Sequence, residues 1–356
     1  MTMPPTRLLV LFFLCVSAIK AYADTHQNLP NALPNVSVGV LKYGTVNWEM
    51  DVIKHYQLDK KYRFNLQVMP LSSKNASAVA LQSKAIEIIL SDWLWVNRQR
   101  FTGKDYTLVP TSIAHGGIYI NGDSTAKSLL DIHQAKIGIA GGSVDKNWLL
   151  LQAYAQKKHQ IKLKETAEMV FATPPLLNRL MQRNNVDAAI NFWHYNARLS
   201  ADGFKLLVSV KQMLAELGIT HNVPVLGWVF DKAWATEHNQ KLTGFLKASN
   251  EAKQRLLLCD NEWQRIRHLT KAENDEVFNA LKKEYRTILL RSFSSEEKEA
   301  SRQVFAILAE QGGRDLVGKA TTLAEETFWQ TDSINLPTTE EINKNLAKHQ
   351  AICTLK

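Results

Sequence analysis

A pattern that occurs twice in the chain, one hundred residues apart, decides the fold. The first copy is LQSKAIEIILSDW at residues 81–93, and the second is MQRNNVDAAINFW at residues 181–193. Each copy reads as a helix end, a short connector, an apolar strand with one acidic residue, and a polar-aromatic strand end. Ligands of open α/β sheets bind at the carboxyl ends of strands. The two copies therefore predict two equivalent strand ends that face one another across a cleft.

The sequence around each copy alternates between strands and helices. Apolar, β-branched runs predict strands, and stretches with helical periodicity lie between them, which indicates βαβ units and mainly parallel sheets. From residue 226 onward the chain becomes almost entirely helical after one more strand. The expected strands are 36–41, 64–69, 86–90, 136–140, 169–171, 186–190 and 226–230, and the expected late helices are 233–258, 262–269, 275–285, 295–310 and 339–349.

The N-terminus has the features of a cleaved signal peptide at residues 1–23. Arg7 precedes the apolar run 8–16, and Ala21-Tyr22-Ala23 forms an A-x-A cleavage site. The run is too short to span a bilayer. We therefore expect an exported, periplasmic protein. Lipid attachment at Cys15 is the alternative, although a bulky leucine precedes this cysteine.

The composition excludes some partners. The formal net charge is +9, with 45% hydrophobic and 22% charged residues, as in an ordinary globular protein. The basic residues are spread along the chain and do not form a block interleaved with aromatic residues. We therefore expect a solvated basic surface and no nucleic-acid binding.

Two cysteines, Cys259 and Cys353, remain after the signal peptide. In an oxidising compartment they form either one disulfide or two free thiols. A disulfide would close a loop of 94 residues. In the chain-entropy model a loop of this length stabilises the fold by about 4 kcal/mol.

The order of these elements resembles the type II periplasmic binding proteins of nitrate/sulfonate/taurine ABC transporters, a group that includes binders of thiamine pyrimidines. The resemblance covers residues 35–315 and departs from the usual family pattern at Lys84 and Glu87, where glycine and aspartate are common. It rests on TVNW at 45–48, the acidic patterns at 85–89 and 185–189, IAGGS at 139–143, and the segments 228–234 and 240–246.

The resemblance implies a two-lobed α/β fold with a ligand cleft between the lobes and a helical C-terminal return. The first lobe would comprise residues 35–120 and 229–330, the second lobe residues 121–228, and the tail 331–356 would pack on the first lobe. Two chain crossings, near 118–123 and 223–230, would form the hinge. The implied protein is a monomer that captures a small organic solute and delivers it to the permease and ATPase of an importer.

Gly142 and Ser143 are the first candidate site. They follow a predicted strand and open a predicted helix, whose free N–H groups and positive dipole end suit an anionic group. Lys146 would add a positive charge one turn further on. The alternative for Ser143 is an ordinary N-cap.

Trp48 is the second candidate. It lies about 200° around the predicted helix from the core residue Val46, so it points either into the cleft or against a neighbouring loop. Thr45 and Asn47 stand beside it at the helix start, where a polar side chain either caps the helix or binds ligand.

The two repeated strand ends are the third candidate. Aromatic rings on both sides would enclose an apolar or cationic group, and Asp92 would pair with an amine. The alternative is that the tryptophans are buried and Asp92 caps a helix. The residues concerned are Ser91, Asp92, Trp93, Asn191, Phe192 and Trp193.

Other candidates are the polar helix start at Ser72, Ser73 and Asn75, and His115 and Trp228 near the crossings. An anion site at Ser143 and an acidic site at Asp92 together predict a zwitterion such as taurine. An aromatic heterocycle between the tryptophans, and a periplasmic receptor that feeds no transporter, are the alternatives.

Motifs for catalysis or cofactor binding are absent from the sequence. It has no G-x-S-x-G, G-x-G-x-x-G, P-loop, H-E-x-x-H or C-x-x-C, and its ten histidines lack metal-ligand spacing. We therefore expect a binding protein with no metal and no cofactor, and no enzyme.

Overall fold

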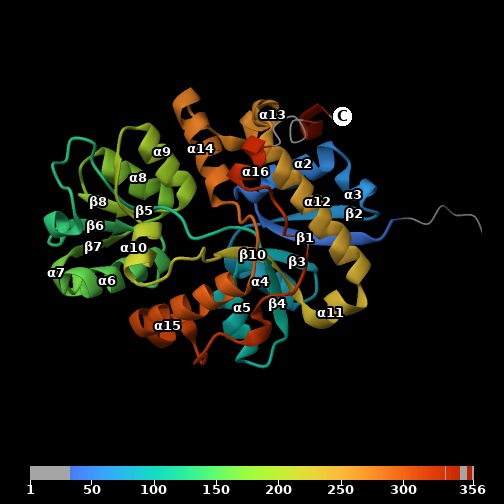
Figure 1. Cartoon of the computed structure of the whole chain (residues 1–356), viewed down its shortest axis with the longest axis horizontal. Coiled ribbons are helices and arrows are strands. Elements are labelled where there is room, and N and C mark those ends of the chain that lie inside the picture. The colour runs from blue at the N-terminus through green and yellow to red at the C-terminus, as the bar shows by residue number, and fades with distance from the viewer. Residues whose placement is uncertain (1–32, 333, 345–350, 355–356) are drawn as a thin grey trace, which may run out of the picture.

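The computed structural model describes residues 33–332, 334–344 and 351–354. The predicted signal peptide, residues 1–23, and Cys15 lie outside this part of the chain. The described chain forms two lobes, each built on a five-stranded sheet with helices packed around it (Figure 1). The predicted two-lobed α/β architecture is therefore confirmed.

The first lobe is built on the sheet with the order β2-β1-β3-β10-β4. Its strands are β1 (Asn35–Leu41), β2 (Asn65–Leu71), β3 (Ile88–Asp92), β4 (Tyr106–Pro110) and β10 (Leu226–Asp231). Its helices are α2 (Val46–His55), α3 (Leu58–Lys61), α4 (Lys74–Gln82), α5 (Trp93–Arg100), α11 (Lys232–Glu237), α12 (Asn239–Leu258) and α13 (Asp260–Thr270).

The second lobe is built on the sheet with the order β7-β6-β8-β5-β9. Its strands are β5 (Gly117–Ile120), β6 (Lys136–Ile139), β7 (Glu168–Phe171), β8 (Ala188–Ile190) and β9 (Lys205–Ser209). Its helices are η1 (Leu129–Ile132), α6 (Lys146–His159), α7 (Leu163–Thr166), α8 (Pro174–Gln182), α9 (Trp193–Ala201) and α10 (Val210–Glu216).

The two sheets have the same topology. In each sheet one strand, β10 or β5, is antiparallel to both of its neighbours, and the remaining pairs are parallel. The repeated pattern occupies the same place in both, because β3 pairs with β1 as β8 pairs with β6. The equivalence of the two strand ends, predicted from the repeat, is confirmed.

The acidic residue of each repeat has the same structural role in both lobes. Glu87 accepts a hydrogen bond from the N–H of Ser37 at 2.7 Å, and Asp187 accepts one from the N–H of Lys136 at 2.8 Å. Each carboxylate thus satisfies a backbone donor near the start of the neighbouring strand, β1 or β6.

The chain crosses between the lobes at residues 111–116 and 217–225, and these two segments lie side by side. The N–H of Ala114 bonds to the carbonyl of Val223 at 2.7 Å, and the N–H of Val225 bonds to that of Ser112 at 2.8 Å. The predicted boundary at 120/121 is wrong, because β5 belongs to the second sheet, and the boundary at 228/229 cuts through β10. A short apolar strand does not reveal in its sequence which sheet it joins.

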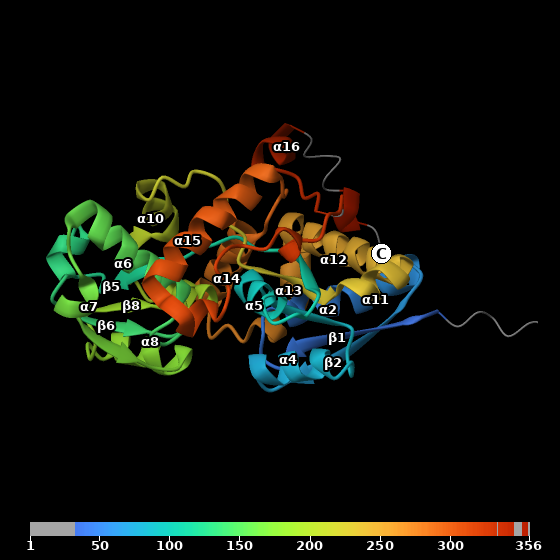
Figure 2. The ribbon, with the colours of Figure 1, turned by 90° about the horizontal axis from the view of Figure 1, so that it is seen from below.

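The helices that follow contact both lobes, rather than the first lobe alone as the range 229–330 implied. Helix α14 (Asp275–Ile288) packs against α9, and α15 (Ser295–Val317) packs against both α6 and α5. Figure 2 shows α15 lying across the gap between the lobes. The short elements η2 (Glu325–Thr327) and α16 (Thr339–Lys344) follow.

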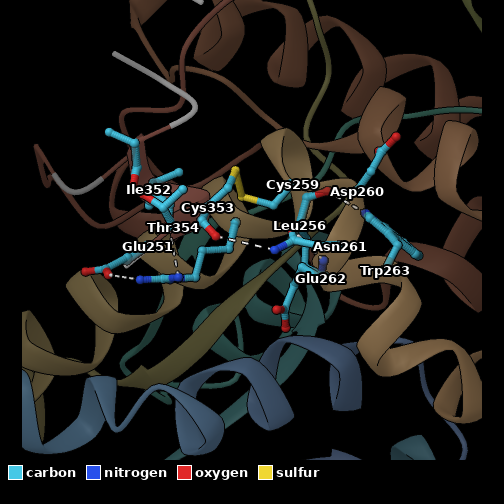
Figure 3. The surroundings of a disulfide bond; sticks show 12 residues. Glu251, Leu256, Cys259, Asp260, Asn261, Glu262, Trp263, Ile352, Cys353 and Thr354 are labelled. Carbon is cyan, nitrogen blue, oxygen red and sulfur yellow. Dashed lines mark hydrogen bonds and ion pairs between the residues drawn. A yellow bond between two sulfur atoms is a disulfide. The ribbon is translucent and has the colours of Figure 1, made fainter. Parts of the chain in front are cut away.

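The described part of the tail is fixed to the first lobe. Leu336 is buried, and its N–H bonds to the carbonyl of Arg291 at 3.0 Å. Cys259, at the start of α13, forms a disulfide with Cys353, so the question left open by the sequence is resolved (Figure 3). Asn261 Nδ2 donates to the carbonyl of Cys353 at 3.3 Å and reinforces this attachment.

Candidate functional site

Strand-end corners of the two lobes are in contact, although each repeated strand end meets a different corner and not its own counterpart. Lys146 Nζ, at the start of α6, lies 3.2 Å from Asp92 Oδ2, at the end of β3. Lys74 Nζ, at the start of α4, lies 5.8 Å from the ring centroid of Phe192, which precedes α9. Each contact joins the corner between a strand and a helix in one lobe to such a corner in the other. These corners form the candidate site, and for the ligand space proposed between them we use the term interlobe cleft.

Asp92 is the central carboxylate of the first-lobe corner. Its Oδ1 caps α5 by accepting the N–H of Trp95 at 2.9 Å, while Oδ2 faces Lys146. Burial acts to raise the pKa of Asp92, but Lys146 and Lys74 outweigh it and hold this pKa below its usual range. The capping role given as the alternative for Asp92 is therefore confirmed, and its second carboxylate oxygen pairs with Lys146 of the other lobe.

The predicted anion site at Gly142 and Ser143 is not formed as expected. Helix α6 begins at Lys146, and its N-cap is Asp145, which accepts the N–H groups of Asn147 and Trp148 at 3.0 and 3.1 Å. Ser143 is exposed in the loop before this cap. Because aspartate and serine cap equally well, the sequence did not show which residue would do so.

Asp145 therefore occupies the place where an anionic ligand would meet the helix dipole. Gly141 makes room for it, since a Cβ at this position would lie 2.2 Å from Asp145 Oδ2. Burial raises the pKa of Asp145 despite the hydrogen bonds from the helix start and the nearby charge of Lys146. A sulfonate at this helix start would have to displace the protein's own carboxylate.

Trp48 points toward the second lobe but is buried among other aromatic rings. It lies edge-on to Trp193 of α9 at 6.0 Å and to Trp263 of α13 at 5.5 Å, and Tyr285 of α14 lies at 5.7 Å. Its Nε1 donates to the carbonyl of Leu269 at 3.2 Å. The packing role is therefore the one that the structure supports for Trp48, and Trp193 is its partly exposed counterpart in the second lobe.

The polar residues before Trp48 stabilise their own loop. Asn47 Nδ2 donates to the carbonyls of Leu41 and Gly44 at 2.9 and 2.7 Å. Thr45 is the N-cap residue of α2, although its side chain makes no capping hydrogen bond. Both residues lie at the helix start where they were predicted, but the amide donors of Asn47 are used within the loop.

The polar helix start at residues 72–75 is exposed. Ser73 caps α4 by accepting the N–H of Ala76 at 3.1 Å, while Ser72 and Asn75 are exposed. Lys74 of this turn reaches the second lobe, a role that the sequence gave no reason to expect.

Two of the predicted tryptophans are core residues rather than cleft residues. Trp93 is 2% exposed and donates from Nε1 to the carbonyl of Pro224 at 2.7 Å. Trp228 is 1% exposed and donates to Ser249 Oγ at 2.9 Å. The apolar environments of these rings in the first lobe bury them, so neither lines the cleft. Ser91, two residues before Trp93, is partly buried in β3.

Asn191 and His115 also have structural partners. Asn191 Nδ2 donates to Asn178 Oδ1 at 2.8 Å and to the carbonyl of Pro174 at 3.0 Å, which ties the strand end to α8. His115 lies in the first crossing segment, and its Nε2 pairs with Glu284 of α14. His115 therefore joins the first crossing segment to a helix that packs on the second lobe.

Two polar residues of α9 near the cleft were missed by the sequence analysis. Among the described residues, Asn196 Oδ1 and His194 Nδ1 are buried and have no hydrogen-bond partner. Burial and the nearby Arg198 lower the pKa of His194 to about 4, so its imidazole is neutral at pH 7. A buried polar atom without a partner has no signature in the sequence.

Two lysines and two aspartates of the corners lie close enough to interact electrostatically. Lys74 and Lys146 both act electrostatically on Asp92 and on Asp145, which gives two positive and two negative side chains. A cavity of about 290 Å³ lies elsewhere, between the second crossing and the start of α15, and none of the corner residues lines it.

Comparison with known proteins identifies the fold. No protein-family model and no curated protein sequence matches the chain. The periplasmic aliphatic sulphonate binding protein SsuA from Escherichia coli is structurally similar, with a TM-score of 0.66, 19% identity, and coverage of 86% of this chain and 94% of that chain. The chain therefore has the two-lobed fold of periplasmic binding proteins.

Two further structures show the range of proteins with this fold. The alkanesulfonate-binding protein SsuA from Xanthomonas axonopodis pv. citri bound to MOPS has a TM-score of 0.62 and 16% identity, over 84% of this chain and 99% of that chain. The desulfurization enzyme DSZB has a TM-score of 0.55 and 11% identity, over 89% and 99%. The structural neighbours are mainly transporter binding proteins, with an enzyme among them.

The described part of the chain has neither a membrane-spanning helix nor a cluster of metal ligands. Within residues 33–332, 334–344 and 351–354, no helix is both long and apolar enough to cross a membrane. In the same part of the chain, no three histidine, cysteine or acidic side chains are grouped as metal ligands.

Proposed function

We propose that this protein is the substrate-binding component of an ABC importer, which captures a small organic solute in the interlobe cleft. The observation that carries the proposal is the contact between strand-end corners of the two lobes, with Asp92 after β3 paired with Lys146 after β6. Ligands of α/β sheets bind at such strand ends. Neighbours described as periplasmic sulfonate-binding proteins support a transport role over catalysis.

The proposal includes the location and the partners of the protein. The signal peptide predicted at residues 1–23 would direct it to the periplasm, where it would act as a monomer. The partners would be the permease and the ATPase of the importer.

The solute that we favour is a zwitterion, with an amino-sulfonate such as taurine as the best candidate. The two positive and two negative corner side chains balance one another, so a ligand with a net charge would leave that charge uncompensated. A zwitterion places an ammonium group near Asp92 and an acid group near Lys146. This assignment moves the anion contact from the helix start at Ser143 to the side chain of Lys146.

A second candidate is an aromatic heterocycle related to the thiamine pyrimidines. The observation in its favour is the ring of Phe192, which is 36% exposed at the second-lobe corner and lies below Lys74 Nζ. A planar ligand would stack on this ring. A sandwich between Trp93 and Trp193 is not available, because Trp93 is in the core.

The mechanism that we propose is capture by closure. The crossing segments at 111–116 and 217–225 lie side by side and would act as the hinge. A solute that contacts both corners binds the closed form more tightly, so it shifts the population toward closure. The importer would then recognise the closed form.

A thermal-shift screen tests the proposal. The mature protein is heated with taurine, alkylsulfonates, nitrate, amino acids, polyamines and thiamine-related pyrimidines. A solute at one hundred times its Kd adds about 2.7 kcal/mol of stability, which raises the Tm of a chain of this size by about 4 °C. A folded protein that no member of the panel stabilises would contradict the proposed solute classes.

A further inference from the structure

Two helices at the surface, one in each lobe, occupy equivalent places in the fold. Helix α4 follows β2, the edge strand of the first sheet, and α8 follows β7, the edge strand of the second sheet. Each helix then leads into the central strand of its sheet, β3 or β8. Figure 2 shows α4 and α8 on the same side of the molecule, opposite α16. The two lobes therefore place one copy each of this strand–helix unit on a common face.

Large apolar side chains are exposed on both units. Val79 of α4 is 64% exposed, and Leu176 of α8 is 48% exposed. The strands before these helices add Val68 and Met69 in the first lobe and Phe171 in the second lobe. These five are among the nine large apolar side chains that are exposed in the described part of the chain. Exposed apolar side chains that gather on one face mark a surface for a partner.

We call the three residues on β2 and α4 the first-lobe patch, and the two on β7 and α8 the second-lobe patch. The charged side chains beside both patches have one sign. Residues 73–84 contain two lysines and no acidic residue, and residues 173–184 contain two arginines and no acidic residue. Lys84, Arg179 and Arg183 are exposed, and they form no ion pair within the described part of the chain. Their charges are therefore available to an acidic partner.

We propose that the first-lobe and second-lobe patches are the surface by which this protein docks on the permease of its importer. This inference rests on the proposed function and extends it to the recognition of the closed form. The two patches lie on different lobes, so motion about the hinge changes their separation. A partner with two fixed contact regions, each apolar and flanked by acidic residues, therefore distinguishes the closed protein from the open one.

A lipid surface and a second copy of this chain fit the two patches less well. A fluid bilayer presents apolar and anionic groups at any spacing, so it would not respond to motion of the lobes. A two-fold dimer buries the same surface on both copies, which would bring the basic residues of two identical faces together. Like charges that face one another in an interface repel. The permease is therefore the occupant that the patches favour.

Site-specific photo-cross-linking, in cells that express the protein from its own gene, tests the docking surface. The photoreactive p-benzoylphenylalanine replaces Val79 in one variant and Leu176 in another. Replacement of Leu206 is the matched control, because this side chain is also 44% exposed but lies on β9, at the opposite edge of the second sheet. Mass spectrometry should identify the permease in the adducts of the first two variants and not in those of the control.

Several outcomes would overturn the docking surface. Adducts with a second copy of the chain would assign the face to an interface between copies. Adducts with lipid alone, no adduct at either Val79 or Leu176, or equal adducts from Leu206 would also contradict it. A membrane protein other than a permease in the adducts would reject the importer and this inference together.

Charge reversal tests the basic residues beside the patches. Lys84→Glu and Arg179→Glu should each lower the cross-linking yield at the neighbouring patch at least about tenfold, because like charges would then face one another. Lys84→Arg keeps the positive charge and should cross-link as the wild type does. Yields that charge reversal leaves unchanged would contradict an acidic docking partner.

Solute binding separates this inference from the proposed function. None of the substituted residues belongs to the corners of the interlobe cleft, so the thermal shift caused by a solute should stay the same in every variant. A solute that stabilises the protein, without any cross-link to a permease, would reject the docking surface and keep the binding function. Cross-links to a permease without a stabilising solute would keep the docking surface and reject the proposed solute classes.

Discussion

The corner after β3 and the corner after β8 have the same backbone plan and different chemistry. Each corner follows the central strand of its five-stranded sheet. In each, the helix that comes next begins with a tryptophan, Trp93 or Trp193. The first corner has Asp92 as a charged helix cap, while the second has Phe192, whose side chain makes no capping bond. The repeated pattern thus specifies the fold, and the residues at its end make the two sides of the cleft different.

The largest expected effect comes from the two equivalent tryptophans. Trp93→Ala should lower the free energy of unfolding by about 3–5 kcal/mol, because it removes a fully buried ring. Trp193→Ala should cost less than half of that, since Trp193 is only partly buried. Urea unfolding followed by circular dichroism measures both. Equal losses would contradict the distinction between a core tryptophan and a cleft tryptophan.

The next residues, Leu94 and His194, should give the corners different pH dependence. The pKa of His194 is lowered to about 4, while an unfolded chain has a histidine pKa of about 6.5. The unfolded state therefore binds more protons in this window, and stability is lost as the pH falls from 6.5 toward 4. Between pH 7 and pH 5 the loss from this residue should be about 2 kcal/mol.

His194→Leu gives the second corner the residue of the first and should remove this part of the acid sensitivity. Urea unfolding of both proteins at pH 7 and pH 5 measures the difference. If the variant loses as much stability as the wild type on acidification, the neutral, buried state of His194 is wrong.

The smallest expected effect comes from the cap itself. Phe192→Asp gives the second corner the charged cap of the first, and an aspartate cap stabilises a helix by about 1 kcal/mol relative to a non-capping residue. Phe192→Asn is the matched control, since it caps without a charge. Both variants should raise the Tm slightly. The Tm of the aspartate variant should also depend on salt concentration, because the new carboxylate would interact with Lys74. A lowered Tm in both would show that packing of the Phe192 ring outweighs capping.

Much of the fold could be predicted from the sequence, because it follows from local periodicity. The strands β1, β2, β6 and β7 and the helices α12 to α15 correspond to apolar patterns with clear periods. The boundaries of the lobes could not be predicted from the sequence, because β5 is a four-residue apolar strand that fits either sheet. Contacts of α14 and α15 with the second lobe depend on tertiary packing that no local pattern encodes.

The candidate site was predicted in position but only partly in its residues. The corners with Asp92 and with Trp193 were found, because strand ends are visible in the repeat. Which of Ser143 and Asp145 caps α6 depends on loop geometry that the sequence leaves open. Lys74 was missed since its partner, Phe192, lies 118 residues further along the chain, in the other lobe.

The most direct test of the central claim, that the two corners bind a solute together, is calorimetric titration of taurine and of ethanesulfonate into wild-type protein and Asp92→Asn. The account predicts that taurine binds the wild type, and that the substitution weakens taurine at least about tenfold while it affects ethanesulfonate much less, because only taurine has an ammonium group for this carboxylate. Equal weakening of both ligands, or no change for taurine, would contradict the assignment of Asp92 to the cleft.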